Sequence, residues 1–482
     1  MRPTIVLKYI GMALLLNAGF MALAAGVSWV SAGDTSSYAL GLAAFLTAVI
    51  GAFPMIFVAP TDSQLSNKEG YTVVVGAWLM SCVVGMLPYL LWGGEFTLAA
   101  AWYESVSGFT TTGSTILQDI DSVPRGLLFW RSCTHWIGGA GVVMFALLVM
   151  PMMGRSRMMV SSVEMSTIAR EDYKYKSSTI IRILLTVYIG LTVACFVLLK
   201  VAGMSWFDAA NHAMSTAATG GFSTHNDSIA YWNSPLIETI LIIFMTISGI
   251  HFGVIFATFT GKRNNLFRSE IVRYYLAFLA CAALAIAVST TLNDTYGTFG
   301  EALRQSAFQT VSRATTTGFT ASDANLWGPF AIAILIFTGI QCACAGSTSG
   351  GIKADRIYLA AKVIRHQIRQ QQHPNAIIRI KLNGVTQESS MLGFVMLFIV
   401  VYLLLLVVGT VFIAAFGYDL LTSFSLASSS LGNVGPSFGA VGGFDSMAVF
   451  PLPVRLFSTL LMLLGRLEIF GLFQIFLLKW WK

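Results

Sequence analysis

Ten apolar runs divide this sequence, and their lengths restrict the possible folds more than any other feature. Seven of them meet or approach the ~20 residues that a helix needs to cross a bilayer. They lie at residues 5–30, 70–92, 178–199, 236–259, 270–291, 391–416 and 449–478. Three shorter or more interrupted runs lie at residues 38–60, 127–150 and 326–345. We therefore expect an all-α polytopic membrane protein with ten spanning helices.

The amount and placement of charge agree with this expectation. Charged residues make up only 11% of the chain, against about 25% in a typical soluble domain, so much of the surface must face lipid. Most Lys and Arg residues fall on one side of a ten-span topology, at residues 2–8, 68, 155–182, 262–273, 353–381 and 479–482. The positive-inside rule makes that side cytoplasmic, which places both termini in the cytoplasm. The net charge of +7 then reflects topology and lipid contact, and no nucleic-acid partner is expected.

The cysteines and histidines show no pattern typical of metal binding or catalysis. All six cysteines lie in apolar runs, and the Cys342-Ala343-Cys344 spacing fits no common zinc site. The six histidines show no metal-ligand spacing, and no Ser/His/Asp arrangement is recognisable. We expect neither a cofactor nor an enzymatic site in this chain.

Four copies of one unit follow the first two runs. In each copy a spanning run leads to a short segment, a glycine-rich loop and a second spanning run. The predicted boundaries are residues 1–69 for a two-helix amino-terminal part, then 70–153, 154–261, 262–382 and 383–482 for repeats 1 to 4. The loops read Thr111-Thr112-Gly113-Ser114-Thr115, Thr219-Gly220-Gly221-Phe222-Ser223, Thr316-Thr317-Gly318-Phe319-Thr320 and Asn433-Val434-Gly435-Pro436-Ser437.

The segment before each loop is too short to span a bilayer. These segments lie at residues 97–109, 206–218, 299–314 and 420–431. They contain polar side chains, such as Glu104, His212 and Gln309, which lipid would penalise. We expect each to be a re-entrant pore helix buried among other helices.

The loops have the composition of a site for a dehydrated cation. Rings of backbone carbonyls replace the hydration shell of potassium in channels, and glycine permits the backbone angles that align such carbonyls. A single Thr-Gly loop is more often an ordinary turn or helix cap. Recurrence in four similar units favours a filter, although the fourth copy keeps only Gly435 and Ser437 of the pattern.

Three motifs resemble one known family. The stretches from Ser107 to Ser114, from Ser312 to Phe319 and from Gly465 to Phe470 are similar to the Trk/Ktr/HKT superfamily of cation transporters. The length and the two additional amino-terminal helices resemble its bacterial TrkH branch. This resemblance implies a potassium-selective pore, a homodimer and a cytoplasmic nucleotide-binding partner of the TrkA type.

The resemblance also implies which residues bind potassium. The ion-facing carbonyls would belong to Thr111, Thr112, Thr219, Gly220, Thr316, Thr317, Asn433 and Val434. The glycines beside them are Gly113, Gly221, Gly318 and Gly435. In this superfamily, serine at the first filter glycine accompanies a preference for sodium, so four glycines support potassium.

A second glycine-rich loop interrupts the third repeat. Three glycines within Gly346-Ser347-Thr348-Ser349-Gly350-Gly351 prevent a continuous helix, and a basic helix is expected at residues 352–372. From the residues alone, this loop is either a cytoplasmic turn or an obstruction in the conduction path. The resemblance implies the obstruction, since TrkH-type proteins carry such an intramembrane loop there.

Arg466 lies near the middle of the last apolar run, where a charge is costly unless it pairs or lines water. A local pair with Glu468 is disfavoured, because positions i and i+2 do not share a helix face. The resemblance places Arg466 beneath the filter, where a positive charge would oppose passing cations.

The function predicted from these features is potassium uptake across the plasma (inner) membrane. One alternative is a sodium-coupled or sodium-preferring transporter of the same superfamily. A second alternative, a membrane-embedded enzyme, would need a carboxylate or histidine cluster in the apolar spans and would leave the four loops unexplained. A third, a membrane scaffold, would show no ion flux.

Overall fold

The computed structural model describes residues 2–58, 66–149, 177–261, 266–375, 379–469 and 471. Most of the basic segment predicted at residues 155–182 lies outside these residues, as do Lys262, Phe470, Lys479 and Lys482. The described chain is helical apart from one short antiparallel hairpin, β1 (Lys381–Leu382) with β2 (Val385–Thr386). The expected all-α architecture is confirmed.

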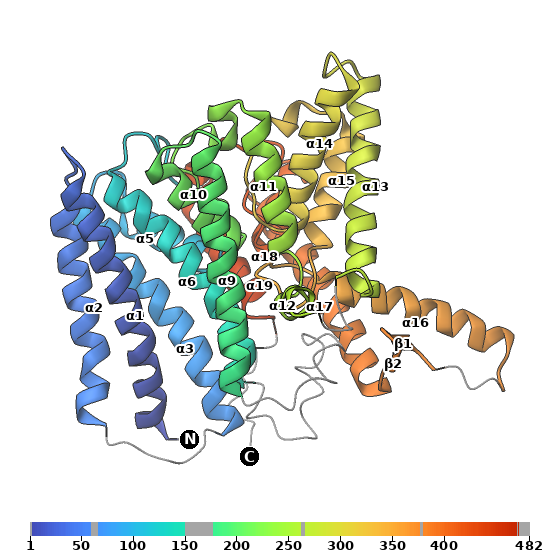
Figure 1. The fold of residues 1–482 in the computed structure, drawn as a ribbon, viewed down its shortest axis with the longest axis horizontal. Helices are drawn as coiled ribbons and strands as arrows, with labels where there is room; N and C mark the ends of the chain where they lie inside the picture. The colour runs from blue at the N-terminus through green and yellow to red at the C-terminus, as the bar shows by residue number, and fades with distance from the viewer. Residues whose placement is uncertain are drawn as a thin grey trace.

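The two amino-terminal helices, α1 (Pro3–Val30) and α2 (Ser37–Phe57), form a hairpin at one edge of the molecule (Figure 1). The two helices approach closely at Gly11 and Gly51, where a Cβ on Gly11 would lie 2.6 Å from the Gly51 carbonyl oxygen. Asp34, in the connecting turn, accepts a hydrogen bond of 2.7 Å from the backbone of Gly126, at the start of α6. The hairpin is thereby attached to the first repeat.

The helices of the four repeats match the predicted order. Repeat 1 contains α3 (Asn67–Gly85), α4 (Leu87–Trp92), α5 (Leu98–Phe109) and α6 (Arg125–Val149). Repeat 2 contains α9 (Ser177–Val201), α10 (Trp206–Ala218), η2 (Ser228–Trp232), α11 (Pro235–Ser248) and α12 (Phe252–Phe259). Repeat 3 contains α13 (Glu270–Leu292), α14 (Phe299–Ala314), η3 (Ala324–Leu326), α15 (Pro329–Ile340) and α16 (Ala354–Gln372). Repeat 4 contains α17 (Ser389–Ala414), α18 (Leu420–Gly432), η4 (Met447–Val449) and α19 (Leu452–Arg466).

The four short segments form the helices α5, α10, α14 and α18, which we call the pore helices. Each begins with a side chain that caps its first turn, and these capping residues are Thr97, Ser205, Thr298 and Asp419. Such caps satisfy backbone N–H groups that a helix leaves open at its start.

Two predicted runs differ from straight spanning helices. The run at residues 236–259 is broken into α11 and α12, which meet at 102°. The break frees backbone groups that then bind the neighbouring segment, since Gly249 O accepts from Cys344 N (3.0 Å) and Phe252 N donates to Gly346 O (3.2 Å). Within the last run, α19 ends at Arg466, and Glu468 and Ile469 just after it adopt left-handed backbone angles. Arg466 therefore lies at a helix end and not near a helix centre.

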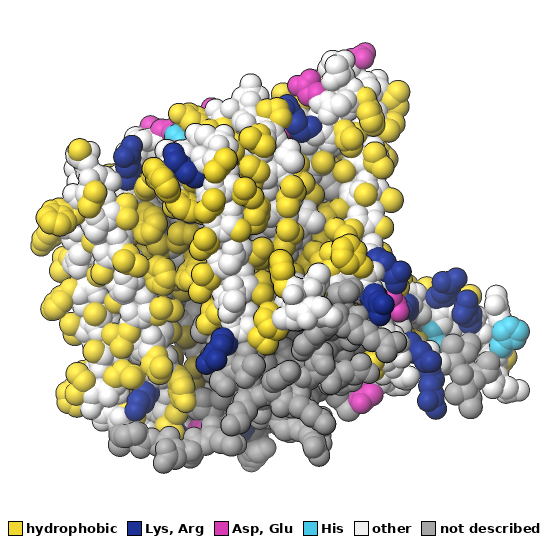
Figure 2. Space-filling model, in the orientation of Figure 1, with side chains coloured by type: hydrophobic (Ala, Val, Ile, Leu, Met, Phe, Trp, Pro, Cys, Tyr) yellow, Lys and Arg dark blue, Asp and Glu magenta, His cyan; other side chains and the backbone are white. Residues whose placement is uncertain are grey.

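The outer surface of the bundle is apolar. Six of the described helices are long and apolar enough to cross a membrane, or seven if α11 and α12 count as one span. Figure 2 shows hydrophobic side chains over the sides of the bundle, while charged side chains gather at its ends and over α16. Helix α16 projects sideways from the bundle (Figure 1) and starts two residues later than predicted.

Candidate functional site

The four glycine-rich loops form a closed ring. We call residues 111–115, 219–223, 316–320 and 433–437 filters 1 to 4. A Cβ added to Gly113 would collide with the carbonyl oxygen of Gly220 in filter 2. In the same way Gly221 faces Thr317 O, Gly318 faces Val434 O, and Gly435 faces Thr112 O. Each loop therefore contacts the next, and filter 4 returns to filter 1.

The backbone of each filter has the same unusual conformation. The residue two positions before the glycine is left-handed in every copy, with φ of 52° at Thr111, 53° at Thr219, 58° at Thr316 and 55° at Asn433. The four glycines also have positive φ, between 79° and 100°. Non-glycine residues rarely adopt such angles, so the surrounding contacts must hold them. The fourth copy, which departs most in sequence, has the same geometry.

A serine in each pore helix supplies part of that support. Ser107, Ser215, Ser312 and Ser429 each lie six residues before the filter glycine. Their carbonyls accept hydrogen bonds of 2.8–2.9 Å from the residue just before that glycine. Three of the four hydroxyls also bind their own filter: Ser215 accepts from Gly221 N, while Ser312 and Ser429 donate to Phe319 O and Gly435 O. Ser107 and Ser312 begin two of the motifs noted in the sequence, but the identical offset of all four serines, a signal available in the repeats, was not recognised.

The four filter glycines line one cavity of about 50 Å³. His225, Asn226 and Asp445 line the same cavity on the side where the filters end. One glycine from each filter thus borders a single narrow space. Within the described ranges, no three His, Cys, Asp or Glu side chains lie close enough to hold a metal ion. The cavity lining offers oxygens of the backbone and of hydroxyl groups, together with the carboxylate of Asp445.

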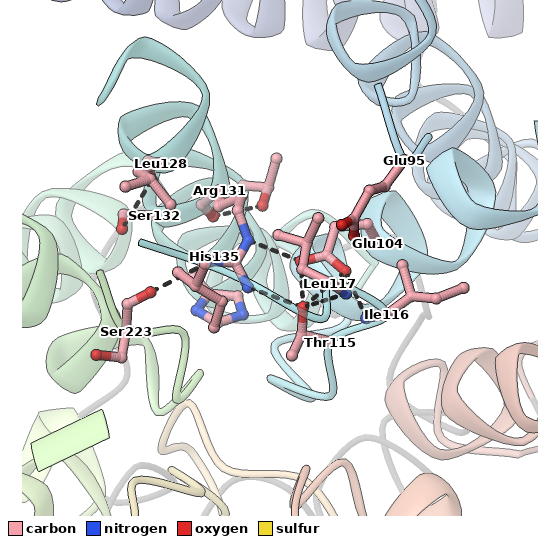
Figure 3. A network of polar contacts seen from close by, with 12 residues as sticks. Glu95, Glu104, Thr115, Ile116, Leu117, Leu128, Arg131, Ser132, His135 and Ser223 are labelled. Carbon is pink, nitrogen blue, oxygen red and sulfur yellow. Dashed lines mark hydrogen bonds and ion pairs between the residues drawn. The ribbon is translucent and has the colours of Figure 1, made fainter. Parts of the chain in front are cut away.

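A buried ion pair lies behind filter 1 (Figure 3). The Arg131 side chain donates from Nε to Glu104 Oε1 at 2.7 Å, and both side chains are at most 1% exposed. Glu104 also accepts from Thr115 Oγ1 and from the backbone of Ile116. The pair ties the pore helix α5 to its own filter and to α6. Sequence analysis named Glu104 only as a polar residue and gave Arg131 no role.

The 346–351 loop lies directly against the filters. Thr348 donates to Ala217 O at 3.1 Å and accepts from Thr219 Oγ1 at 3.3 Å, and Gly350 N donates to Thr316 Oγ1 at 2.9 Å. A Cβ on Gly350 would collide with Gly432 O beside filter 4. The loop contacts the approaches to three filters, and its Ser347, Thr348 and Ser349 are at most 2% exposed. A peripheral turn would not be buried in this way.

Arg466 contacts the same loop. Its Nη1 donates to Thr348 O at 2.7 Å, and its Nη2 donates to Gly138 O of α6 at 3.3 Å. Among the described residues it forms no ion pair with a carboxylate, while the nearby Glu468 pairs with Arg356. Arg466 thus binds the loop through one hydrogen bond and links it to α6 through another.

Comparison with known proteins places these features in a family. A model of the TrkH family, described as cation transport protein, matches residues 40–479. A Trk system potassium uptake protein TrkH from Salmonella typhimurium is 32% identical over 99% of both chains, and one from Halomonas elongata is 34% identical over 87% of both. The crystal structure of the potassium transporter TrkH from Vibrio parahaemolyticus superposes with a TM-score of 0.90 at 28% identity, covering 100% of both chains.

Proposed function

Because the chain belongs to the TrkH family of cation transport proteins, we propose that it carries potassium ions inward through the ring of its four filters. The observation that carries this proposal is the closed ring, in which each filter glycine lies against a carbonyl of the next filter and all four glycines line one narrow cavity. Carbonyl and hydroxyl oxygens suit a cation that must be released again. The named relatives are potassium uptake proteins, which supports potassium as the substrate.

The ion-binding residues of this proposal are those predicted from the sequence. The carbonyls of Thr111, Thr112, Thr219, Gly220, Thr316, Thr317, Asn433 and Val434 would coordinate potassium. Their support is the shared left-handed conformation of the filters, which aligns successive carbonyls in the same way in each repeat.

The 346–351 loop and Arg466 would form the gate. The loop touches three filters and is fastened from below by Arg466, so an ion leaving the filters meets both an obstruction and a positive charge. Conduction then requires the loop to move away from Thr219 and Thr316. The break between α11 and α12 supports this role, because it binds the residues that flank the loop.

The partners would be a second copy of this chain and a cytoplasmic TrkA-type nucleotide-binding subunit, in the plasma membrane. Helix α16 starts just after the loop, projects from the bundle and carries basic residues such as Arg365 and Arg369. A subunit that binds α16 would therefore be well placed to move the loop. Copurification with a TrkA-type subunit tests this proposal, and failure to associate with any nucleotide would contradict it. Cross-linking in native membranes tests the homodimer.

The transport proposal is tested with purified protein in liposomes. We expect uptake of radioactive rubidium, a potassium analogue, that excess potassium inhibits strongly and excess sodium inhibits weakly. Stronger inhibition by sodium would favour the sodium-preferring alternative. Absence of flux from folded protein would contradict transport and favour a scaffold or an enzyme.

A further inference from the structure

The carbonyl of the last residue in each filter is held by a different repeat, and it is held in two ways. In filter 1, Thr115 O accepts from the backbone N–H of Met447 at 2.9 Å. In filter 3, Thr320 O accepts from the backbone N–H of Ile229 at 3.0 Å. At this carbonyl, filters 1 and 3 are thus held by a backbone N–H group, although Arg131 also donates from Nη2 to the Thr115 hydroxyl at 3.2 Å.

Filters 2 and 4 use an arginine at the equivalent position. Arg131 donates from Nη1 to Ser223 O at 3.2 Å (Figure 3). Arg313 donates from Nη1 to Pro436 O at 3.0 Å and from Nη2 to Ser437 O at 3.5 Å. Ser223 and Ser437 occupy the same position in their filters, two residues after the glycine.

Each arginine also stacks on an aromatic ring next to the carbonyl that it binds. The guanidinium carbon of Arg131 lies 4.0 Å from the centre of the Phe222 ring. That of Arg313 lies 4.0 Å from the centre of the Phe438 ring. A planar guanidinium can stack and donate in its own plane at once, whereas an ammonium group cannot. The pair of contacts therefore requires arginine and not merely positive charge.

The two arginines do not occupy the same place in their repeats. Arg131 is on α6, after filter 1, whereas Arg313 is in the last turn of pore helix α14, before filter 3. Repetition of one ancestral contact does not account for them. Both nevertheless reach forward to the filter of the following repeat, which indicates a shared requirement of filters 2 and 4.

Their electrostatic settings differ. Glu104 balances Arg131, but within the described part of the chain Arg313 forms no ion pair with a carboxylate. Arg313 is only 6% exposed, and a buried charge of this kind is costly. Arg313 is instead stabilised by its hydrogen bonds to filter 4 and by its contact with the Phe438 ring. These contacts connect its charge to the filter, which a structural ion pair would not do.

We infer that Arg131 and Arg313 are positioning residues that hold the ends of filters 2 and 4 and thereby set ion selectivity. This inference rests on the proposed function. Neither arginine has to touch the ion. Each fixes the carbonyl two residues after the glycine, so that the oxygens around the ion keep their spacing when a smaller cation enters.

The test is Arg313→Lys, with Arg304→Lys as its matched control. Both residues lie on α14, and Arg304 pairs with Glu238 (3.3 Å), away from the filters. We expect Arg313→Lys to lower the ratio of potassium to sodium uptake in liposomes about tenfold, a change typical of lost positioning contacts. Arg304→Lys should keep the ratio of the parent. A merely structural role would lower yield or melting temperature and leave the ratio unchanged.

A second variant covers the case in which Arg313→Lys does not fold. Phe438→Leu removes the ring under Arg313, and Phe457→Leu, in the Phe412–Phe457 stack of the same repeat, is its control. We expect only Phe438→Leu to lower the ratio. A ratio equal to that of the parent in folded Arg313→Lys, or in folded Phe438→Leu, overturns the inference. A parent protein that does not discriminate potassium from sodium instead overturns the proposed function.

Discussion

At the scale of single residues, a side chain on a filter glycine would enter the space of the neighbouring repeat. Gly113 and Gly318 have φ of 79°, and their Cβ atoms would collide with Gly220 O and Val434 O. We expect Gly113→Ser and Gly318→Ser each to reduce potassium over sodium discrimination roughly tenfold, or ~1.4 kcal/mol, because the carbonyl ring must deform. Competition of both ions for rubidium uptake measures the change.

The control for this prediction is Gly300→Ser. Gly300 is on the pore helix α14, and a Cβ there would meet no atom within 4 Å. Its discrimination should equal that of the parent. If both filter variants also matched the parent, the ring would not be the filter.

Variants of Arg466 distinguish two possible roles for this residue, an electrostatic barrier to ions and a structural contact. We expect Arg466→Ala to raise flux, because it removes a positive charge from the path and a hydrogen bond from Thr348 of the loop. Arg466→Lys keeps the charge and should change flux little. Rubidium flux per folded protein measures both. A folded alanine variant that conducts no faster than the parent would show that Arg466 is not the barrier.

The burial of the Glu104–Arg131 ion pair predicts how strongly its loss lowers the stability of the protein. Glu104→Gln leaves the guanidinium without its carboxylate in a site at most 1% exposed, which costs about 3–5 kcal/mol. Glu238→Gln removes the partner of Arg304, which is 25% exposed, and should cost less because solvent screens the remaining charge. Thermal unfolding in one detergent compares the two, and equal losses would contradict the argument.

Several site residues could be predicted from the sequence, and others could not. The filter glycines recur in register, so their pattern is visible without coordinates. Arg131 and Arg313 have no common position in the repeats, and what unites them is a carbonyl two residues after a glycine in another repeat. Contacts between distant segments of this kind leave no periodic signal.

At the scale of elements, hydropathy and polar interruptions predicted the pore helices well. Helices α10 and α14 have the predicted bounds, and α5 and α18 differ by one residue at one end. The break at Gly249 was missed, although Ser248, Gly249, His251 and Gly253 interrupt the apolar run 236–259 near its centre. A helix break that is satisfied by another segment, here Cys344 and Gly346, is a tertiary effect and not a local one.

Deletion of the 346–351 loop tests its proposed role as the gate. A backbone bridge between Gln341 and Ile352 closes its base, so a deletion of residues 346–351 leaves the flanking chain segments paired. We expect the deletion to raise unregulated flux, since it removes the contacts with Thr219 and Thr316. Flux measured without any partner subunit reports the change. A folded deletion protein with ordinary regulated flux would refute the gate.

At the scale of the whole molecule, the proposed topology predicts accessibility from two sides. Tyr231, near the cavity mouth, is 56% exposed, and Gln371 is exposed at the far end of α16. We expect Tyr231→Cys to react with a membrane-impermeant maleimide in intact cells and Gln371→Cys only in opened cells. The parent protein is the control, since all its described cysteines except Cys281 are buried. Labelling of both variants from the same side would contradict the topology.

The family and the fold were accessible at this scale because repeated hydropathy survives sequence divergence. The cyclic order of the filters could not be predicted from the sequence, because it depends on which filter lies next to which other filter in the folded structure. Hydropathy indicates which parts of each repeat face lipid. The contacts between repeats, such as Gly113 with Gly220 and Gly435 with Thr112, are visible only in the structure.

The closed ring is made from one covalent chain, and this permits an arrangement that identical subunits forbid. A pore of four equal chains would have to carry every loop and every arginine four times, and four copies of the 346–351 loop would collide on the axis. Linked repeats can diverge separately, so one repeat supplies the loop, another supplies Arg466 beneath it, and two supply arginines to their neighbours. Because the four repeats belong to one chain, each has separate contacts, and a single mutation can alter one repeat alone.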